Sequence, residues 1–383
     1  MNIIDYVIKS KNESFLARPF SDADALVFSQ IAYYNFNLVS EQFDYSKPSK
    51  RYTLFNLLNS DFKDDVLVYR TLMGKNLLKL IKPLKESKRF KDIEIGYVQE
   101  ILDRRAESQF FALTFFLPND EIFIAFRGTD STLAGWKEDF NMAHLTTVPS
   151  HLKALLYTES VLKFEKNKKF YLGGHSKGGN LAYYVANKID DKYLDNLIKV
   201  YNLDGPGFKH PEEIFNKDKE KLLKDRYLKA IPHSSLVGIL LNHDSETIII
   251  KSSQFYVLQH DLFSWLLTKD NYNLITLKRR SLISRINEKT MKNYLHSLDD
   301  NEKKEIVDAL LEMLGGVELS LFDLSIKPLK TIKHFRKVYR SYPKEKRNKL
   351  FRAVTLLIKQ WGNAVISISM SKTTSLVKRR KNA

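Results

Sequence analysis

A glycine-rich stretch in the middle of the chain places one serine where it could act as a nucleophile. The motif Gly-His-Ser-Lys-Gly at 174–178 follows a strand-like run at 169–172 and precedes a helix-like run at 180–188. A strand that turns directly into a helix strains the corner residue and projects its side chain outward. Ser176 would lie above a helix N-terminus, where free N–H groups stabilise negative charge. The pattern predicts nucleophilic catalysis at Ser176, with an ordinary tight turn as the alternative.

A serine hydroxyl becomes a good nucleophile only when a base accepts its proton, and histidine titrates near neutral pH. The chain has nine histidines and no cysteine, which excludes a cysteine nucleophile. In hydrolases with this kind of serine corner, the acid and then the histidine follow the serine along the chain. His260, after the strand-like run 247–251, is our first choice for the base. His243 and His233, which lie between two strand-like runs, come second and third.

The acid that would orient the imidazole has two main candidates. Asp204 follows the strand-like run 198–203 and precedes Gly-Pro-Gly, and sites in parallel sheets form at the carboxyl ends of strands. Asp244 lies just ahead of the final strand-like run, and Asp261 adjoins His260 but is poorly placed to reach the same ring. We favour Asp204 over Asp244. The structural alternative for Asp204 is an Asx-turn over the glycines that follow it.

The oxyanion of an acyl-transfer reaction needs preorganised hydrogen-bond donors. One donor would be the backbone N–H of Lys177, directly after the serine. A second would come from the loop after the strand-like run 121–126, where Gly128 permits close approach of the backbone. Thr129 in this loop offers both an N–H and a hydroxyl. We therefore predict an oxyanion hole formed by Thr129 and Lys177.

Three motifs together resemble the class 3 lipases, a branch of the α/β hydrolases. They are Phe-Arg-Gly-Thr-Asp at 126–130, Gly-Trp-Lys-Glu-Asp-Phe at 135–140 and Gly-His-Ser-Lys-Gly-Gly-Asn-Leu-Ala at 174–182. The last of these, with Leu-Asp-Gly-Pro-Gly-Phe at 203–208 and Gln-His-Asp-Leu-Phe-Ser-Trp at 259–265, is similar to an uncharacterised bacterial family described as Mbeg1-like. The resemblance covers most of the chain. It implies that Thr129 is an oxyanion donor, that the Trp136–Asp139 segment packs behind it, and that the substrate is a lipid.

Two departures from the lipase pattern stand out. Class 3 lipases usually carry an apolar residue where this chain has Lys177. Their acid follows the next strand, where this chain has no carboxylate before Asp244. The second departure makes the acid the least secure member of the expected triad.

The surrounding runs predict an α/β protein. Hydrophobic residues make up 43% of the 383 residues, which is typical of a folded chain. Strand-like runs alternate with helical ones, which favours the α/β-hydrolase fold, a mostly parallel sheet with helices on both faces. The strand-like runs are 93–98, 109–117, 121–126, 169–172, 198–203, 228–231 and 247–251, with a hairpin joining the second and third. The helical runs are 20–36, 52–85, 152–165, 180–188 and 211–225.

The last part of the chain differs in pattern and in charge. Amphipathic helices are expected at 281–298, 301–314, 327–339 and 344–358, with a frayed end from residue 371. Residues 271–383 hold 25 Lys and Arg against 10 Asp and Glu, so they carry +15 of the net charge of +17. We divide the chain into an α/β-hydrolase domain at 1–270, with a candidate helical cap at 52–90, and a basic helical extension at 271–383.

The charge of the extension favours an anionic partner, and we expect peripheral contact with an anionic membrane surface; a solvated helical face is the plainer interpretation. No recognition helix or zinc spacing indicates specific nucleic-acid binding, and no metal or phosphate-loop motif indicates a cofactor. The N-terminus has no secretory-signal pattern, and no run reaches about 18 apolar residues. A cytoplasmic location follows, extending to the inner membrane surface if the extension binds there.

The leading functional hypothesis is a serine hydrolase, lipase- or esterase-like, which cleaves a small-molecule or lipid ester through an acyl-enzyme intermediate. Its catalytic residues would be Ser176, His260 and Asp204. The alternative is an inactive hydrolase-fold protein that serves as a binding or scaffold protein and uses its basic extension to hold an anionic partner. Labelling of Ser176 by a fluorophosphonate distinguishes the two.

Overall fold

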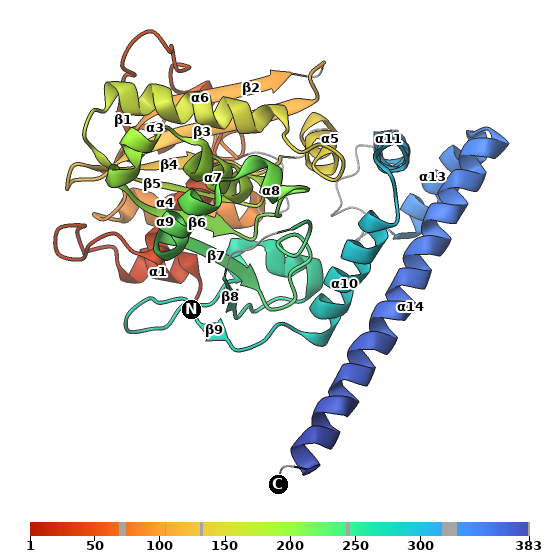
Figure 1. The fold of residues 1–383 in the computed structure, drawn as a ribbon. Helices are drawn as coiled ribbons and strands as arrows, with labels where there is room; N and C mark the ends of the chain where they lie inside the picture. The colour runs from red at the N-terminus through yellow and green to blue at the C-terminus, as the bar shows by residue number, and fades with distance from the viewer. Residues whose placement is uncertain (69–73, 104, 131–132, 243–245, 316–327, 382–383) are drawn as a thin grey trace.

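A single mixed sheet forms the centre of the protein in the computed structural model, which describes residues 1–68, 74–103, 105–130, 133–242, 246–315 and 328–381 (Figure 1). Among these residues nine strands pair in chain order. They are β1 (Tyr52–Thr53), β2 (Glu94–Asp103), β3 (Ser108–Phe116), β4 (Glu121–Phe126), β5 (Lys169–His175), β6 (Leu197–Leu203), β7 (Tyr227–Pro232), β8 (Thr247–Ile250) and β9 (Thr276–Leu277). Strands β4 to β8 run parallel, while β1 to β3 and β9 add antiparallel edges.

The register of the parallel strands brings their carboxyl ends together. Phe126 of β4 lies opposite Gly174 of β5, and His175 of β5 lies opposite Leu203 of β6. The loops after β4, β5 and β6 therefore leave the sheet at the same edge. Because sites in parallel sheets form at this edge, the topology positions the predicted residues near one another.

Helices cover both faces of the sheet, as expected for an α/β hydrolase. Side chains of β4 alternate: Ile122 and Ile124 join the core cluster with the helices at 149–164 and 177–188, while Phe123 and Ala125 join the cluster with the helices between residues 3 and 86. The helices on the body are α1 (Ile3–Lys9), α2 (Asp22–Ile31), α3 (Leu54–Leu58), α4 (Gly74–Glu86), α5 (Leu133–Asn141), α6 (Pro149–Phe164), α7 (Lys177–Lys188), α8 (Pro211–Ile214) and α9 (Lys217–Leu223). The expected fold class is confirmed.

Two segments differ from the sequence-based expectation. The single helix expected at 211–225 is broken into α8 and α9, because Phe215 turns into the core and Asn216 caps a new helix through the N–H groups of Asp218 and Lys219. The helical run expected at 52–85 is also divided: residues 52–53 form β1, α3 ends at Leu58, and α4 begins only at Gly74. Helix α4 buries one apolar side in the main core cluster. A cap role for residues 52–90 remains a prediction.

The C-terminal extension is helical in its described parts and lies at one side of the body (Figure 1). Its helices are α10 (Leu282–His296), α11 (Asp300–Gly315), α13 (Pro328–Ser341) and α14 (Lys344–Lys381). We expected the last helix to end near residue 358 and the chain to fray from 371, but α14 continues to Lys381. Residues 359–381 hold no proline and one glycine, Gly362, so no strong stop signal interrupts the helix.

The sheet extends beyond residue 270, where we placed the end of the α/β-hydrolase domain. Strand β9, at residues 276–277, pairs with β8. The two-domain division remains a prediction. None of the helices in the described ranges combines the length and the apolarity needed to cross a bilayer.

Candidate active site

Ser176 lies at the corner between β5 and α7. Its backbone angles are φ 58° and ψ −130°, a conformation that L residues rarely adopt. Its N–H donates to the carbonyl of Leu203 at 2.9 Å, which ties the corner to the neighbouring strand. A Cβ at Gly178 would collide with the carbonyl oxygen of Phe126, so only glycine fits at that position. The strained serine corner expected from the sequence is therefore present.

Asp204 and His260 meet beside this corner. His260 Nδ1 and Asp204 Oδ2 are 2.7 Å apart, and the carboxylate is fully buried while the imidazole is 20% exposed. Asp204 Oδ1 accepts two further hydrogen bonds, from Ser235 Oγ at 2.6 Å and from the N–H of Gly238 at 3.1 Å. Three donors thus fix the carboxylate. A proton on Nδ1, held by Asp204, leaves Nε2 of His260 as the basic nitrogen.

His233 and Asp261, two of the alternatives considered from the sequence, make other hydrogen bonds. His233 Nδ1 pairs with the side chain of Gln259. Asp261 accepts from the N–H of Phe263 and from Asn76, and burial raises its pKa above the ordinary value. The Nδ1 of His260 pairs with Asp204 and not with this carboxylate. His243 and Asp244 lie outside the described residues.

His175 links the Ser176 corner to the backbone of His260. Its Nε2 donates to the backbone carbonyl of His260 at 2.7 Å, and Tyr33 donates its hydroxyl hydrogen to Nδ1 at 3.1 Å. The rings of His175 and His260 lie 4.4 Å apart between centroids. Burial lowers the pKa of His175 well below the ordinary value, so the ring is neutral. The residue before Ser176 therefore holds the backbone of His260 in place.

The two atoms predicted to react carry no hydrogen bond among the described residues. Within the described part of the chain, neither Ser176 Oγ nor His260 Nε2 has a hydrogen-bond partner. Hydrogen bonds between a nucleophile and its base are often long without substrate and tighten in the complex. Both groups are thus available to a substrate carbonyl and its proton.

The predicted oxyanion donors lie against the corner. A Cβ at Gly128 would lie 3.0 Å from Ser176 Cβ, so the loop after β4 approaches the nucleophile closely. The hydroxyl of Thr129 is buried beside Asp139 without a hydrogen bond of good geometry to it. The N–H of Lys177 opens α7 and has no acceptor among the described residues. Buried donors left unpaired at a site fit a role in binding developing charge.

The side chain of Lys177 forms a buried ion pair behind the corner. Its Nζ lies 2.9 Å from Glu138 Oε2, with the two side chains 1% and 0% exposed. Nζ also donates to the carbonyl of Gln109, and Glu138 accepts from the N–H groups of Gln109 and Ser150. Burial would raise the pKa of Glu138, but the charge of Lys177 and these hydrogen bonds hold it below the ordinary value. The positive charge of Lys177, the residue that departs from the lipase pattern, is therefore balanced inside the protein by Glu138.

The segment from Trp136 to Asp139 supports the oxyanion loop. Trp136 Nε1 donates to the carbonyl of Asp130 at 3.1 Å. Although Asp139 as a residue is only half-buried, its carboxyl Oδ1 is shielded from solvent. Burial raises the pKa of Asp139 to about 6, even though the charge of Lys177 opposes this shift.

An exposed apolar segment immediately precedes the base. The apolar ridge, as we name it, comprises Phe255, Tyr256, Val257 and Leu258, which are between 37% and 74% exposed. Gln259, the next residue, is buried. Its side chain donates to the carbonyl of Gln254 and accepts from the N–H of Ser234. A run of four exposed apolar residues needs a functional explanation in a folded protein.

The first helix of the extension braces the loop that holds Asp204. Ser281, the N-cap of α10, pairs with Ser234 through their hydroxyls at 2.9 Å, and Ser284 donates to the carbonyl of Ser235. Since Ser235 donates to Asp204, residues beyond 280 contribute to the order of the site.

Sequence reasoning missed several supporting residues. Tyr33 and Ser235 carried no signal, because each reaches the site only through folding. Glu138 could have been inferred, since a lysine buried after the nucleophile needs a counter-charge. The structure brings together Ser176, Thr129, Lys177, Asp204 and His260.

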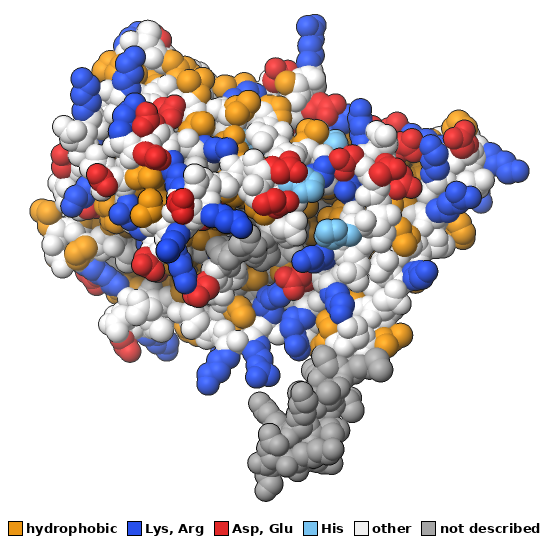
Figure 2. Space-filling model, viewed as in Figure 1, with side chains coloured by type: hydrophobic (Ala, Val, Ile, Leu, Met, Phe, Trp, Pro, Cys, Tyr) orange, Lys and Arg blue, Asp and Glu red, His pale blue; other side chains and the backbone are white. Residues whose placement is uncertain are grey.

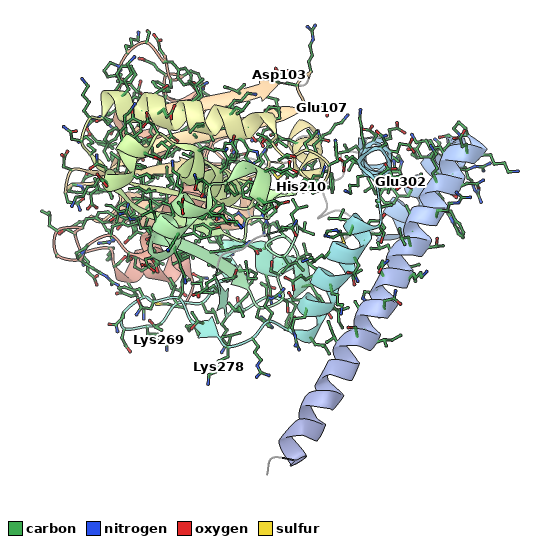
Figure 3. All side chains as sticks on the ribbon, in the orientation of Figure 1. Asp103, Glu107, His210, Lys269, Lys278 and Glu302 are labelled. Carbon is green, nitrogen blue, oxygen red and sulfur yellow. The ribbon has the colours of Figure 1, made fainter. Side chains whose placement is uncertain are left out.

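One further group of potential metal ligands lies on the surface. His210, Glu212 and Glu213 bring their ligand atoms within 4.8 Å of one another in the described part of the chain. Figure 3 shows His210 on the side of the body that faces the extension. Glu212 and Glu213 are exposed and His210 is half-buried, and nothing else at this position indicates an ion.

Comparison with protein families decides the relationship of the chain. The model of the Mbeg1-like family matches residues 84–312, which is more than half of the sequence. The chain belongs to the Mbeg1-like family. The matched region holds all five predicted site residues and extends into α11, so the family resemblance is confirmed.

Other comparisons add little. No curated protein matches the chain. Among solved structures, one described as M37 lipase is similar at 16% identity over 58% of this chain and 70% of its own, with a TM-score of 0.32. A likeness at that level carries no argument about activity.

Proposed function

We propose that this protein is a serine hydrolase that cleaves carboxylic esters through an acyl-enzyme intermediate. Ser176 Oγ attacks the carbonyl carbon while His260 Nε2 takes its proton. The Thr129 hydroxyl and the Lys177 N–H stabilise the oxyanion of the tetrahedral intermediate. His260 then returns the proton to the leaving alcohol. A water activated by the same imidazole hydrolyses the acyl-enzyme and frees Ser176.

The observation that carries the proposal is the hydrogen bond between His260 and Asp204 beside a strained serine. The 2.7 Å contact selects the tautomer in which Nε2 accepts a proton. The buried carboxylate stabilises the imidazolium that forms in the transition state. Its three donors hold it in one orientation, which favours a preorganised site over a structural Asx-turn.

The apolar ridge supports an apolar acyl group in the substrate. Phe255 and Tyr256 are 74% and 62% exposed, four to five residues before the base. An acyl chain lying on this ridge would remove apolar surface from water, worth about 25 cal/mol per Å². Esters with longer acyl chains should therefore gain in kcat/KM until the ridge is covered.

An ester panel of graded acyl length tests the proposal. Wild type should hydrolyse these esters, and Ser176→Ala should lower kcat about 10³-fold or more because the acyl-enzyme cannot form. Ser46→Ala, at an exposed serine, is the matched control and should leave kcat unchanged. Activity that survives in Ser176→Ala would contradict the proposal. A wild type without activity on any ester would favour the binding-protein alternative.

A further inference from the structure

Helix α14 uses one face to pack on the rest of the extension. Ala353 and Ala364 are buried on this face, and α14 lies along α10 (Figure 1). Gln360 donates to Ser297 Oγ at 3.2 Å. Lys346 and Lys349 pair with Glu312 and Glu305 of α11. These contacts orient the helix and define which side remains open.

The open side of α14 is apolar. Large side chains recur there at spacings of three, four and three residues. They are Phe351, Val354, Ile358 and Trp361, which we call the free face, with exposed fractions of 64%, 55%, 63% and 47%. Figure 2 shows hydrophobic side chains along the outer edge of this helix, interspersed with basic ones. A stripe of this kind, uncovered by the described residues, marks an interaction surface.

The charge of α14 indicates which kind of partner the free face can bind. Residues 344–381 hold eleven Lys and Arg and one acidic residue, Glu345, a net charge of +10. A second copy of α14 on the free face would bring two such helices together, and like charges at an interface oppose association. Arg352 and Lys359 have no ion-pair partner among the described residues. The surface is therefore suited to an anionic partner.

The partner must also accept the apolar stripe. Nucleic acid would satisfy the cations but leave Phe351 and Ile358 in water. The interface of an anionic bilayer satisfies both, because apolar side chains enter the acyl boundary, tryptophan lies at the headgroups, and basic residues meet the phosphates. We propose that α14 docks the protein on anionic lipid bilayers through its free face. This inference does not depend on the proposed hydrolase activity.

The structure shows how to test the docking surface without damaging the site. Removing the whole extension would also remove α10, whose Ser281 and Ser284 brace the loop beneath Asp204. Substitutions on the free face avoid this problem, because exposed positions rarely change stability by more than about 0.5 kcal/mol. Leu222→Ser on α9 is a matched control, since Leu222 is 68% exposed and far from α14 in sequence.

The measurement is co-sedimentation of the full chain with vesicles of phosphatidylcholine, alone or mixed with phosphatidylglycerol. Wild type should bind the mixed vesicles and bind the neutral ones more weakly. Ile358→Ser should weaken binding about tenfold, and Phe351→Ser with Ile358→Ser about a hundredfold. Arg352→Gln with Lys359→Gln should weaken it roughly twentyfold at low salt. Leu222→Ser and Ser176→Ala should bind as wild type does.

Several results would overturn the docking proposal. The proposal is contradicted if the free-face substitutions do not weaken vesicle binding. It is also contradicted if wild type stays in the supernatant with both kinds of vesicle. A wild-type dimer that Ile358→Ser converts to a monomer assigns the face to a second copy. A further such result is that wild type binds DNA or RNA tightly and in a salt-dependent way, with no vesicle binding and no effect of Ile358→Ser. That result would show that the basic residues of α14 bind nucleic acid and would overturn the proposal. Loss of ester hydrolysis in Ser176→Ala bears only on the proposed activity.

Discussion

Replacing Glu138 with glutamine removes the counter-charge of a lysine buried directly behind the nucleophile. Lys177 is 1% exposed, so its ammonium group cannot be rescued by water. Removing one partner of a buried pair costs about 3–5 kcal/mol, because the other charge stays buried without compensation. Lys177→Met should cost a similar amount by leaving the carboxylate of Glu138 unpaired.

The double variant Glu138→Gln with Lys177→Met separates the cost of an unpaired buried charge from the other costs of the substitutions. With both charges gone, two defects remain. One backbone N–H, of Gln109 or Ser150, faces the glutamine amide instead of a carboxylate oxygen, and the carbonyl of Gln109 loses the donor that Lys177 supplied. Two unsatisfied buried groups cost about 2–6 kcal/mol. The sum of the two single variants would be about 6–10 kcal/mol, so the predicted coupling energy is about 4 kcal/mol.

Urea unfolding of wild type, the two single variants and the double variant at pH 7 measures this coupling. Asp190→Asn is the control, because the ion pair of Asp190 with Lys192 is largely exposed and should contribute less than about 1 kcal/mol. Single variants that each cost under about 1 kcal/mol, with a double variant equal to their sum, would refute the buried-charge reasoning.

Three further predictions concern the residues around Ser176. Asp204→Asn should lower kcat about 10⁴-fold with KM nearly unchanged, because the imidazole loses its tautomer control; a loss under tenfold would exclude Asp204 as the acid. Thr129→Val should lower kcat about 10²–10³-fold, because it removes the proposed oxyanion donor; unchanged kcat would place the oxyanion elsewhere. The folded pKa of Asp139, raised to about 6 from 3.8, means that only the folded state keeps this proton between those pH values. Stability should therefore fall by up to about 3 kcal/mol as pH rises from about 4 to 6, and the fall should vanish in Asp139→Asn by urea unfolding across that range.

The fold was largely predictable from the sequence, and so was the placement of Ser176 and Asp204 at one edge of the sheet. Strand-like runs flanking Ser176 and Asp204 were recognisable because buried parallel strands are short and uniformly apolar. Ser176 and Asp204 follow adjacent strands, so the parallel sheet places both at one edge. His260 could be placed only by its order along the chain, since its loop carries no periodic pattern.

The supporting contacts were not predictable in the same way. Tyr33 reaches His175 across 142 positions, and Ser235 reaches Asp204 across 31. Such pairs depend on how helices and loops pack over the sheet, which local pattern does not encode. We expected α14 to be shorter than it is, because the residues after 358 are mixed in polarity. Its length follows from the near-absence of helix breakers.

Mass spectrometry after reaction with a fluorophosphonate tests the central claim most directly. The reagent should add one phosphonyl group to the peptide that contains Ser176, and His260→Gln should slow this reaction about 10³-fold, because Nε2 no longer takes the proton. Gln254→Ala, in the same loop, should react as fast as wild type if its backbone carbonyl alone supports Gln259. An adduct on another residue, or folded wild type that does not react, would contradict the account.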